Sequence, residues 1–146
     1  MIENTIHSDL MFATEDIIAH QVNCQGVMSS GVANAIRSTF PEAYERFIAI
    51  GANDNHLGRV QLVKTSSGTY IANLFGQKTF GRSGIHTNYD ALRSAFKTLS
   101  NYALKNNLTV AMPYKIGSDR GGGEWSVIKT MINEEFIDVP VTLYKL

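Results

Sequence analysis

The sequence contains a single cysteine, Cys24, and this scarcity limits its possible chemistry. One cysteine can form neither an internal disulfide nor a cysteine-based metal cluster, and it is typical of proteins from a reducing compartment. The histidines are also too scattered to suggest a metal-ligand pattern: His7, His20, His56 and His86. We therefore expect a cytoplasmic protein with neither a metal site nor a cofactor.

An excess of charge is also lacking, because thirteen basic residues balance thirteen acidic ones. Without net positive charge or a run of Lys and Arg, no face of the protein would attract a polyanion. No apolar stretch approaches the length of about 20 residues that a membrane span needs, and the N-terminus lacks the regions of a signal peptide. We expect a monomer that binds neither nucleic acid nor membranes, although backbone amides can still bind a small anion.

The sequence does contain enough apolar residues for a core, since 44% of its 146 residues are hydrophobic. This content and length predict one domain, residues 1–146. Apolar patterning predicts strands and helices in alternation. A short turn at 66–68 joins two of the strands as a hairpin, so the order predicts an α/β fold, a three-layer α/β/α sandwich with a mixed sheet. The predicted strands are 2–8, 16–22, 59–65, 69–75, 108–112 and 139–144, and the predicted helices are 32–40, 42–50, 88–105 and 125–137.

Two loops rich in small residues, 23–31 and 112–125, each follow a predicted strand and precede a predicted helix. A helix N-terminus offers unpaired N–H groups and partial positive charge, and glycine lets a ligand approach the backbone closely. A flexible turn is the alternative, but a tight turn needs only one or two residues with positive φ, and Gly121 to Gly123 are three. Because ligands of such sheets bind beyond the carboxyl ends of strands, we expect both loops to border one cleft.

Familiar nucleotide and hydrolase motifs are missing. Gly122 and Gly123 are followed by Glu124 and Trp125, not by the Lys and Ser or Thr of a P-loop. The first strand is not followed by a G-x-G-x-x-G fingerprint, and no G-x-S-x-G nucleophile elbow occurs. Kinase-like NTPases, dinucleotide-dependent oxidoreductases and serine hydrolases are therefore disfavoured.

Several single residues allow two interpretations. Cys24 could be a nucleophile with His20 or His86 as its base, but a small, semi-buried packing residue is the favoured interpretation. His20, within an apolar strand, is by default a core histidine, with a functional role as the alternative. Asp9 would ordinarily cap a turn, and Trp125 would ordinarily pack in the core.

Four short motifs occur in order along the chain: Ser-Asp-Leu at 8–10, Ala-His-Gln-Val-Asn-Cys-Gln-Gly at 19–26 leading to Ser-Gly-Val-Ala at 30–33, Met-Pro at 112–113 with the loop 116–123, and Thr-Leu-Tyr at 142–144. Together they resemble the macrodomain family of ADP-ribose binders over nearly the whole chain. A Tyr-x-x-Leu helix start, here Tyr89 and Leu92, and a Trp that opens the last helix, here Trp125, resemble features of a small single-domain branch of that family. This branch includes ADP-ribose 1″-phosphate phosphatases and terminal ADP-ribose glycohydrolases.

The resemblance implies a role for each motif. Asp9 would accept the adenine amino group, Asn23 would contact the distal ribose, the loop around Gly31 would hold that ribose and the diphosphate, and residues 117–123 would wrap the diphosphate. The ligand-binding residues predicted in this way are Asp9, Leu10, Gln25, Gly26, Ser29, Ser30, Gly31, Val32, Ile116, Gly117, Ser118, Arg120, Gly121, Gly122 and Gly123. We also expect Gly122→Val to weaken ADP-ribose binding in a folded domain.

The resemblance also suggests a reaction. Its glycohydrolase branch uses a lysine and an aspartate where this chain has Gln77 and Gly121, although Lys78 and Asp119 are close in sequence. Its phosphatase branch has a histidine at the position of His20, and an ordinary histidine pKa suits proton transfer. We therefore predict phosphate removal from ADP-ribose 1″-phosphate, with His20, Asn23 and Asp119 as catalytic residues. Removal of ADP-ribose or acetyl esters, or ADP-ribose binding without catalysis, are the alternatives.

Overall fold

The structure is a computed structural model that describes residues 1–29, 31–81 and 83–146. Within these ranges six strands form one sheet in the order β1-β6-β5-β2-β4-β3. The pairings are parallel except that of β3 with β4, which confirms the predicted mixed sheet. The strands are β1 (Ile2–His7), β2 (Ile17–Asn23), β3 (Val60–Lys64), β4 (Tyr70–Gln77), β5 (Val110–Pro113) and β6 (Val141–Lys145).

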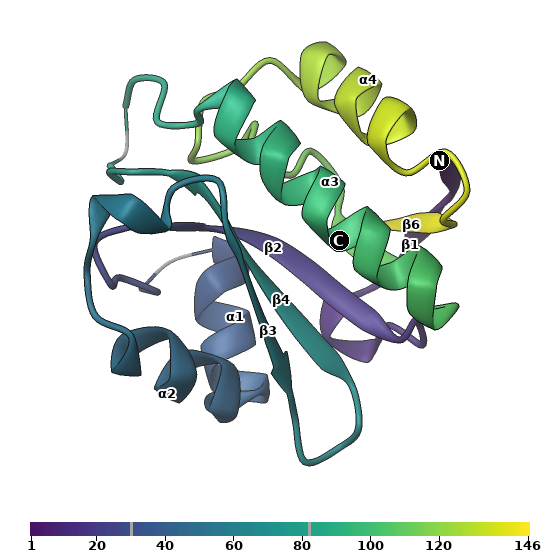
Figure 1. The fold of residues 1–146 in the computed structure, drawn as a ribbon, viewed down its shortest axis with the longest axis horizontal. Coiled ribbons are helices and arrows are strands. Elements are labelled where there is room, and N and C mark those ends of the chain that lie inside the picture. The colour runs from purple at the N-terminus through teal and green to yellow at the C-terminus, as the bar shows by residue number, and fades with distance from the viewer. Residues whose placement is uncertain (30, 82) are drawn as a thin grey trace.

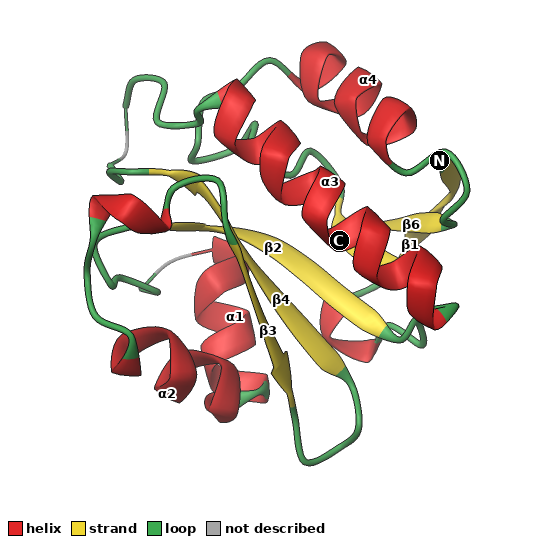
Figure 2. Cartoon of the chain, in the orientation of Figure 1, coloured by secondary structure: helices red, strands yellow, loops and turns green. Residues whose placement is uncertain are grey.

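Helices cover both faces of the sheet, which confirms the three-layer architecture (Figure 1). Figure 2 shows α1 (Gly31–Thr39) and α2 (Pro41–Ala49) on one face, with α3 (Tyr89–Asn106) and α4 (Trp125–Glu135) on the other. The predicted elements match these bounds to within two residues at either end. Short 3-10 helices, η1 (Leu10–Phe12) and η2 (Asp54–His56), lie in the connections.

Local sequence signals explain where the helices begin and end. Pro41 is the first residue of α2, a position at which its missing N–H costs nothing. The side chain of Asn88 accepts a hydrogen bond from the Ala91 amide and caps α3. Asn107 ends the same helix in the left-handed conformation, with φ of 55°.

No helix in the described ranges combines the length and the apolar character that crossing a membrane requires.

Alternation along β2 places its side chains on both faces of the sheet. Ile17 and Ala19 pack in the core cluster that includes α3 and α4, whereas Ile18 packs in the cluster that includes α1. By the same alternation, His20 faces the α1 layer and Gln21 faces the α3 layer. The carboxyl ends of β2, β4 and β5 meet at one edge, which is where the loops rich in small residues begin.

Candidate functional site

Two adjoining cavities lie at this edge of the sheet. The first has a volume of about 420 Å³ and the second about 360 Å³, and four residues line both of them: Gly31, Val32, Pro113 and Tyr114. The shared residues come from the start of α1 and the end of β5. Volumes of this size suit a small-molecule ligand, and the shared lining lets one extended molecule occupy both cavities.

The structure brings most of the predicted site residues to these cavities. The second cavity is lined by Asp9 and Leu10, together with the shared Gly31 and Val32. Five predicted residues are absent from both linings, namely Gln25, Gly26, Ser118, Gly122 and Gly123. Ser30 lies outside the described residues. The predicted residues that line the first cavity are His20, Asn23, Ser29, Gly31, Val32, Ile116, Gly117, Asp119, Arg120 and Gly121.

His20 is 1% exposed and hydrogen-bonds at one ring nitrogen. Its Nε2 lies 2.7 Å from Oδ1 of Asn73, while the Asn73 amide group donates to Gln61 and to the Ala43 carbonyl. Asn73 Oδ1 therefore accepts, so Nε2 of the imidazole carries the proton and Nδ1 is an acceptor. Nδ1 has no hydrogen-bond partner among the described residues, although it is buried.

Burial also changes the acidity of this histidine. Because its site disfavours the charged form, burial lowers the pKa of His20 to about 4, and the Asn73 hydrogen bond opposes this effect only in part. The expectation of an ordinary histidine pKa is therefore wrong. At neutral pH and without a ligand, the imidazole is neutral and offers a lone pair at Nδ1.

Asn23 shapes the loop that follows β2. Its Oδ1 accepts from the amides of Gln25 and Val27, at 3.0 and 3.3 Å, and its Nδ2 donates to the Val27 carbonyl at 2.9 Å. Gln25 and Gly26 therefore form the turn that Asn23 closes. One N–H of the Asn23 amide remains for a ligand.

Asp9 has the capping role expected from the sequence. Its Oδ1 accepts from the Met11 amide at 2.9 Å and caps η1. The carboxylate also lines the second cavity, and its Oδ2 has no partner within the described ranges. One side chain can therefore cap the turn and accept a hydrogen bond from a ligand.

The loop from Tyr114 to Glu124, here called the glycine loop, presents backbone donors. No acceptor is recorded in the described part of the chain for the amides of Gly117, Asp119, Arg120 and Gly121, all of which line the first cavity. Lys115 has φ of 61°, a left-handed conformation that is unfavourable for a residue other than glycine. Backbone strain and unpaired amides beside a cavity are typical of a binding site for an anion.

The last two glycines of this loop make room for other parts of the protein. A Cβ on Gly122 would lie 2.4 Å from the carbonyl oxygen of Gly84, and one on Gly123 would lie 2.9 Å from that of Gly117. Neither distance leaves room for a side chain. Close packing within the protein thus explains why glycine occupies positions 122 and 123. Contact of Gly122 and Gly123 with a ligand stays a prediction.

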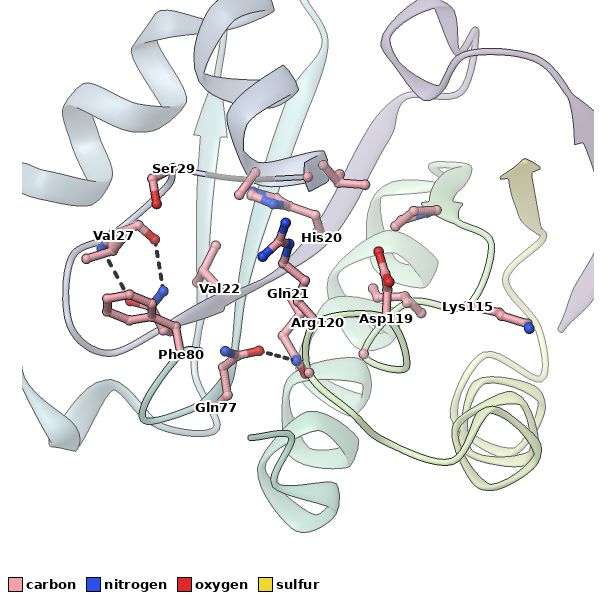
Figure 3. A pocket seen from close by; sticks show the side chains of 18 of the residues that line it. His20, Gln21, Val22, Val27, Ser29, Gln77, Phe80, Lys115, Asp119 and Arg120 are labelled. Atoms are coloured by element: carbon pink, nitrogen blue, oxygen red, sulfur yellow. Dashed lines mark hydrogen bonds between the residues drawn. The ribbon is translucent and has the colours of Figure 1, made fainter. Parts of the chain in front are cut away.

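Three residues with a central place in the site were missed in the sequence. Gln21 Nε2 donates to Gln77 Oε1 at 2.6 Å and to Thr87 Oγ1 at 2.9 Å, and the Thr87 hydroxyl donates to the Gly117 carbonyl at 2.7 Å. Gln21 and Gln77 both line the first cavity, and Figure 3 shows the hydrogen bond between their side chains. For Gln21 and Gln77 the signal was a polar side chain near the end of a buried strand, whereas Thr87 lies in the connection between β4 and α3.

Cys24 has no catalytic partner in the described structure. Its side chain is 2% exposed, packs with Val22 and Met28, and lines neither cavity. Burial raises the pKa of the Cys24 thiol, which disfavours the nucleophilic thiolate. His20 bonds to Asn73, and His86 bonds to Thr79 and Ser83. The favoured interpretation of Cys24 as a small packing residue is confirmed.

Over the described ranges, no three His, Cys, Asp or Glu side chains are grouped so that they could hold a metal ion. The sequence matches a known family: the model described as Macro domain covers residues 19–132. The chain belongs to the Macro domain family. This result confirms the resemblance carried by the four sequence motifs.

Three relatives illustrate the range of this macrodomain's neighbours. An uncharacterised 17.5 kDa protein of Enterobacteria phage T4, from the tk-vs intergenic region, is 29% identical over 140 residues, which are 91% of this chain and 89% of the relative. A macrodomain protein from Streptomyces coelicolor has 26% identity and a TM-score of 0.81, over 99% of this chain and 98% of that one. DarTG of Thermosipho africanus, solved in complex with ADP-ribose, has 20% identity and a TM-score of 0.80, over 97% of this chain and 41% of that one. At 20% identity, the likeness shows the fold.

Proposed function

We propose that this macrodomain binds ADP-ribose across the two joined cavities and releases phosphate from ADP-ribose 1″-phosphate. The observation that carries the proposal is the shared lining at Gly31 and Val32, with Asp9 at one end and His20 at the other. An adenosine diphosphate with a second ribose is an extended ligand that suits this arrangement. The ADP-ribose complex of the structurally similar DarTG supports the same ligand class.

In this proposal each end of the ligand meets a different kind of group. The Oδ2 oxygen of Asp9 accepts from the adenine amino group in the second cavity. The diphosphate lies between the N-terminus of α1 and the unpaired amides of the glycine loop, because both provide N–H donors and partial positive charge. The remaining N–H of Asn23 donates to a hydroxyl of the distal ribose.

The reaction is proposed to use His20 and Asp119 as proton carriers. A phosphate beside Nδ1 favours the protonated imidazole, because an opposite charge raises the pKa of a histidine. Water attacks the phosphorus and gives its proton to the Asp119 carboxylate. The bond between phosphorus and the 1″ oxygen breaks, and His20 donates its proton to that oxygen. The products are inorganic phosphate and ADP-ribose.

One observation favours phosphate removal over a glycohydrolase reaction that needs a lysine and an aspartate. Gln77 is neutral, buried and hydrogen-bonded to Gln21 and to the Thr79 carbonyl. At Gly121, a Cβ would lie 2.3 Å from Oγ1 of Thr87, so a side chain does not fit there. Removal of ADP-ribose or acetyl esters by other groups, and binding without catalysis, are the competing proposals.

Two measurements test the proposed function. Calorimetry measures ADP-ribose binding, and phosphate release from ADP-ribose 1″-phosphate is then followed for wild type, His20→Ala and the exposed control His7→Ala. We expect binding, turnover by wild type and the control, and loss of at least about a hundredfold in rate for His20→Ala. Failure to bind ADP-ribose would overturn the whole proposal, whereas binding without phosphate release would leave a reader or a different hydrolase.

A further inference from the structure

The side-chain amide of Gln21 fits between three glycines. A Cβ on Gly76 would lie 2.2 Å from its Oε1, one on Gly121 would lie 2.9 Å from its Nε2, and one on Gly117 would lie 3.5 Å from its Oε1. Gly76 lies near the end of β4, and the other two belong to the glycine loop. The close contacts at Gly76 and Gly121 show that glycine at these two positions makes room for Gln21.

The same amide links two loops through Thr87. Its Nε2 donates to Gln77 and to the Thr87 hydroxyl, which in turn donates to the Gly117 carbonyl. The backbone adds two bonds between the same segments, from the amides of His86 and Thr87 to the Gly121 carbonyl, at 2.7 and 2.9 Å. Residues 86–87 and the glycine loop therefore meet around one side chain of β2.

The oxygen of the Gln21 amide, unlike its nitrogen, forms no hydrogen bond that links the loops. Gln21 Oε1 is buried and has no hydrogen-bond partner among the residues that the structure describes. A buried acceptor without a partner is unfavourable. The oxygen therefore does not explain a glutamine at this position, whereas the two hydrogen bonds that Nε2 donates between the loops do.

We propose that Gln21 is a positioning residue: it holds residues 78–81 and 83–87 and the glycine loop at the spacing that the ligand's diphosphate and distal ribose require. This inference rests on the proposed function. Gly117, Gly121, Phe80 and Gly81 all line the first cavity, so the spacing of these two loops sets its width. The second cavity is lined by none of these four residues and shares only Tyr114 with the glycine loop.

The principal test variant is Gln21→Met, which keeps the length of the side chain and removes both donors. We expect ADP-ribose to bind at least about tenfold more weakly, because small displacements of binding groups are costly. Adenosine, which would occupy only the second cavity, should bind with unchanged affinity. Hydrogen exchange at the His86 and Thr87 amides should accelerate by at least about tenfold, since these amides bond to the Gly121 carbonyl.

Asn133→Met is the matched control, because Asn133 uses its side-chain amide far from the cavities, to accept from the Ile2 amide. It should leave both affinities and the two exchange rates unchanged. If Gln21→Met does not fold, Thr87→Val removes the relay hydroxyl and should reproduce the same changes in binding and exchange.

Each outcome separates this inference from the proposed function. Unchanged exchange at His86 and Thr87, or an equal loss of ADP-ribose and adenosine affinity, would overturn the positioning role. Faster exchange with wild-type ADP-ribose affinity would overturn it too. If the wild type does not bind ADP-ribose, the proposed function fails, while faster exchange in the variant still supports the link between the loops.

Discussion

Nε2 of His20 lies 2.7 Å from Oδ1 of Asn73, and the two residues stand directly opposite one another on β2 and β4. Asn73 in turn donates to Gln61, which stands opposite it on β3. A row of three polar side chains thus crosses the sheet beneath α2, and only its inner end, at His20, reaches the first cavity. Of this row, His20 is therefore the member that a ligand in the first cavity can contact.

Acid should destabilise the protein through His20. Its pKa is about 4 in the folded state and about 6.5 in the unfolded chain, so the unfolded state binds more protons between these values. Stability is complete above about pH 6.5 and falls as the pH decreases toward 4, by up to about 3 kcal/mol from this group. Urea unfolding of wild type and His20→Gln at several pH values measures the difference.

The His7→Gln variant is the control for that series, because His7 is an exposed residue of β1. It should keep the pH dependence of the wild type, whereas His20→Gln should lose part of it. Parallel curves for wild type and His20→Gln would contradict the assignment of this acid sensitivity to His20.

A carboxylate in place of the Asn73 amide should raise the pKa of His20. In Asn73→Asp, a negative charge would stand beside Nε2 and favour the imidazolium by about 1–3 pH units. NMR titration of the His20 ring protons measures the change, with Asn53→Asp as a control in an exposed turn. A His20 pKa that stays near 4 in Asn73→Asp would show that burial outweighs the introduced charge.

Gly122→Ala should destabilise the protein more than Gly68→Ala does. Both glycines have positive φ, 71° and 91°, so alanine is strained at either site by about 1 kcal/mol or more. Only at Gly122 would the new Cβ also meet a carbonyl oxygen, that of Gly84, because the space around Gly68 is open. We expect an additional loss of about 1–3 kcal/mol in the free energy of unfolding.

Amide chemical shifts of Ile85 and His86 should move in Gly122→Ala and stay unchanged in Gly68→Ala. Equal destabilisation by the two substitutions would contradict the contact with Gly84. A fall in ADP-ribose affinity for Gly122→Val would then have two causes, displacement of Gly84 and loss of a ligand contact, so that variant alone does not locate the diphosphate.

Asp9→Asn should weaken ADP-ribose binding without unfolding the protein. Asparagine keeps an oxygen that can accept from the Met11 amide, so the cap of η1 is preserved. Its amide nitrogen replaces the oxygen that would accept from adenine, which we expect to cost about tenfold in affinity. Calorimetry with Glu45→Gln as an exposed control checks this, and wild-type affinity in Asp9→Asn would exclude Asp9 from the site.

The fold could be predicted from the sequence because its signals are local. The turn at 66–68 revealed the antiparallel pair, Pro41 marked the start of α2, and apolar runs marked β2 and β5. These features depend on neighbours in the chain, so no tertiary contact was needed to recognise them. The order of strands in the sheet did need such contacts and is a finding of the structure.

The site could be predicted only in part, for the same reason. The loops after β2 and β5 indicated the cavities, but the pKa of His20 depends first on its burial and then on Asn73, which is fifty-three positions away along the chain. The link formed by Gln21, Thr87 and Gly117 likewise joins three distant segments. The three adjacent glycines suggested a single role, close approach of a ligand to the backbone. In the structure, however, Gly121 and Gly122 make room for different neighbours within the protein.

The parallel pairing of β1 with β6 has a consequence for how the protein is made. β1 is at the edge of the sheet and pairs with the last strand, from Ile2 beside Val141 to His7 beside Lys145. During synthesis, the first strand must wait for residues more than a hundred positions later before it gains its backbone partner. Contacts of such long range slow folding, so the ribosome-bound chain should form its central strands first and close the cavity that contains Asp9 last.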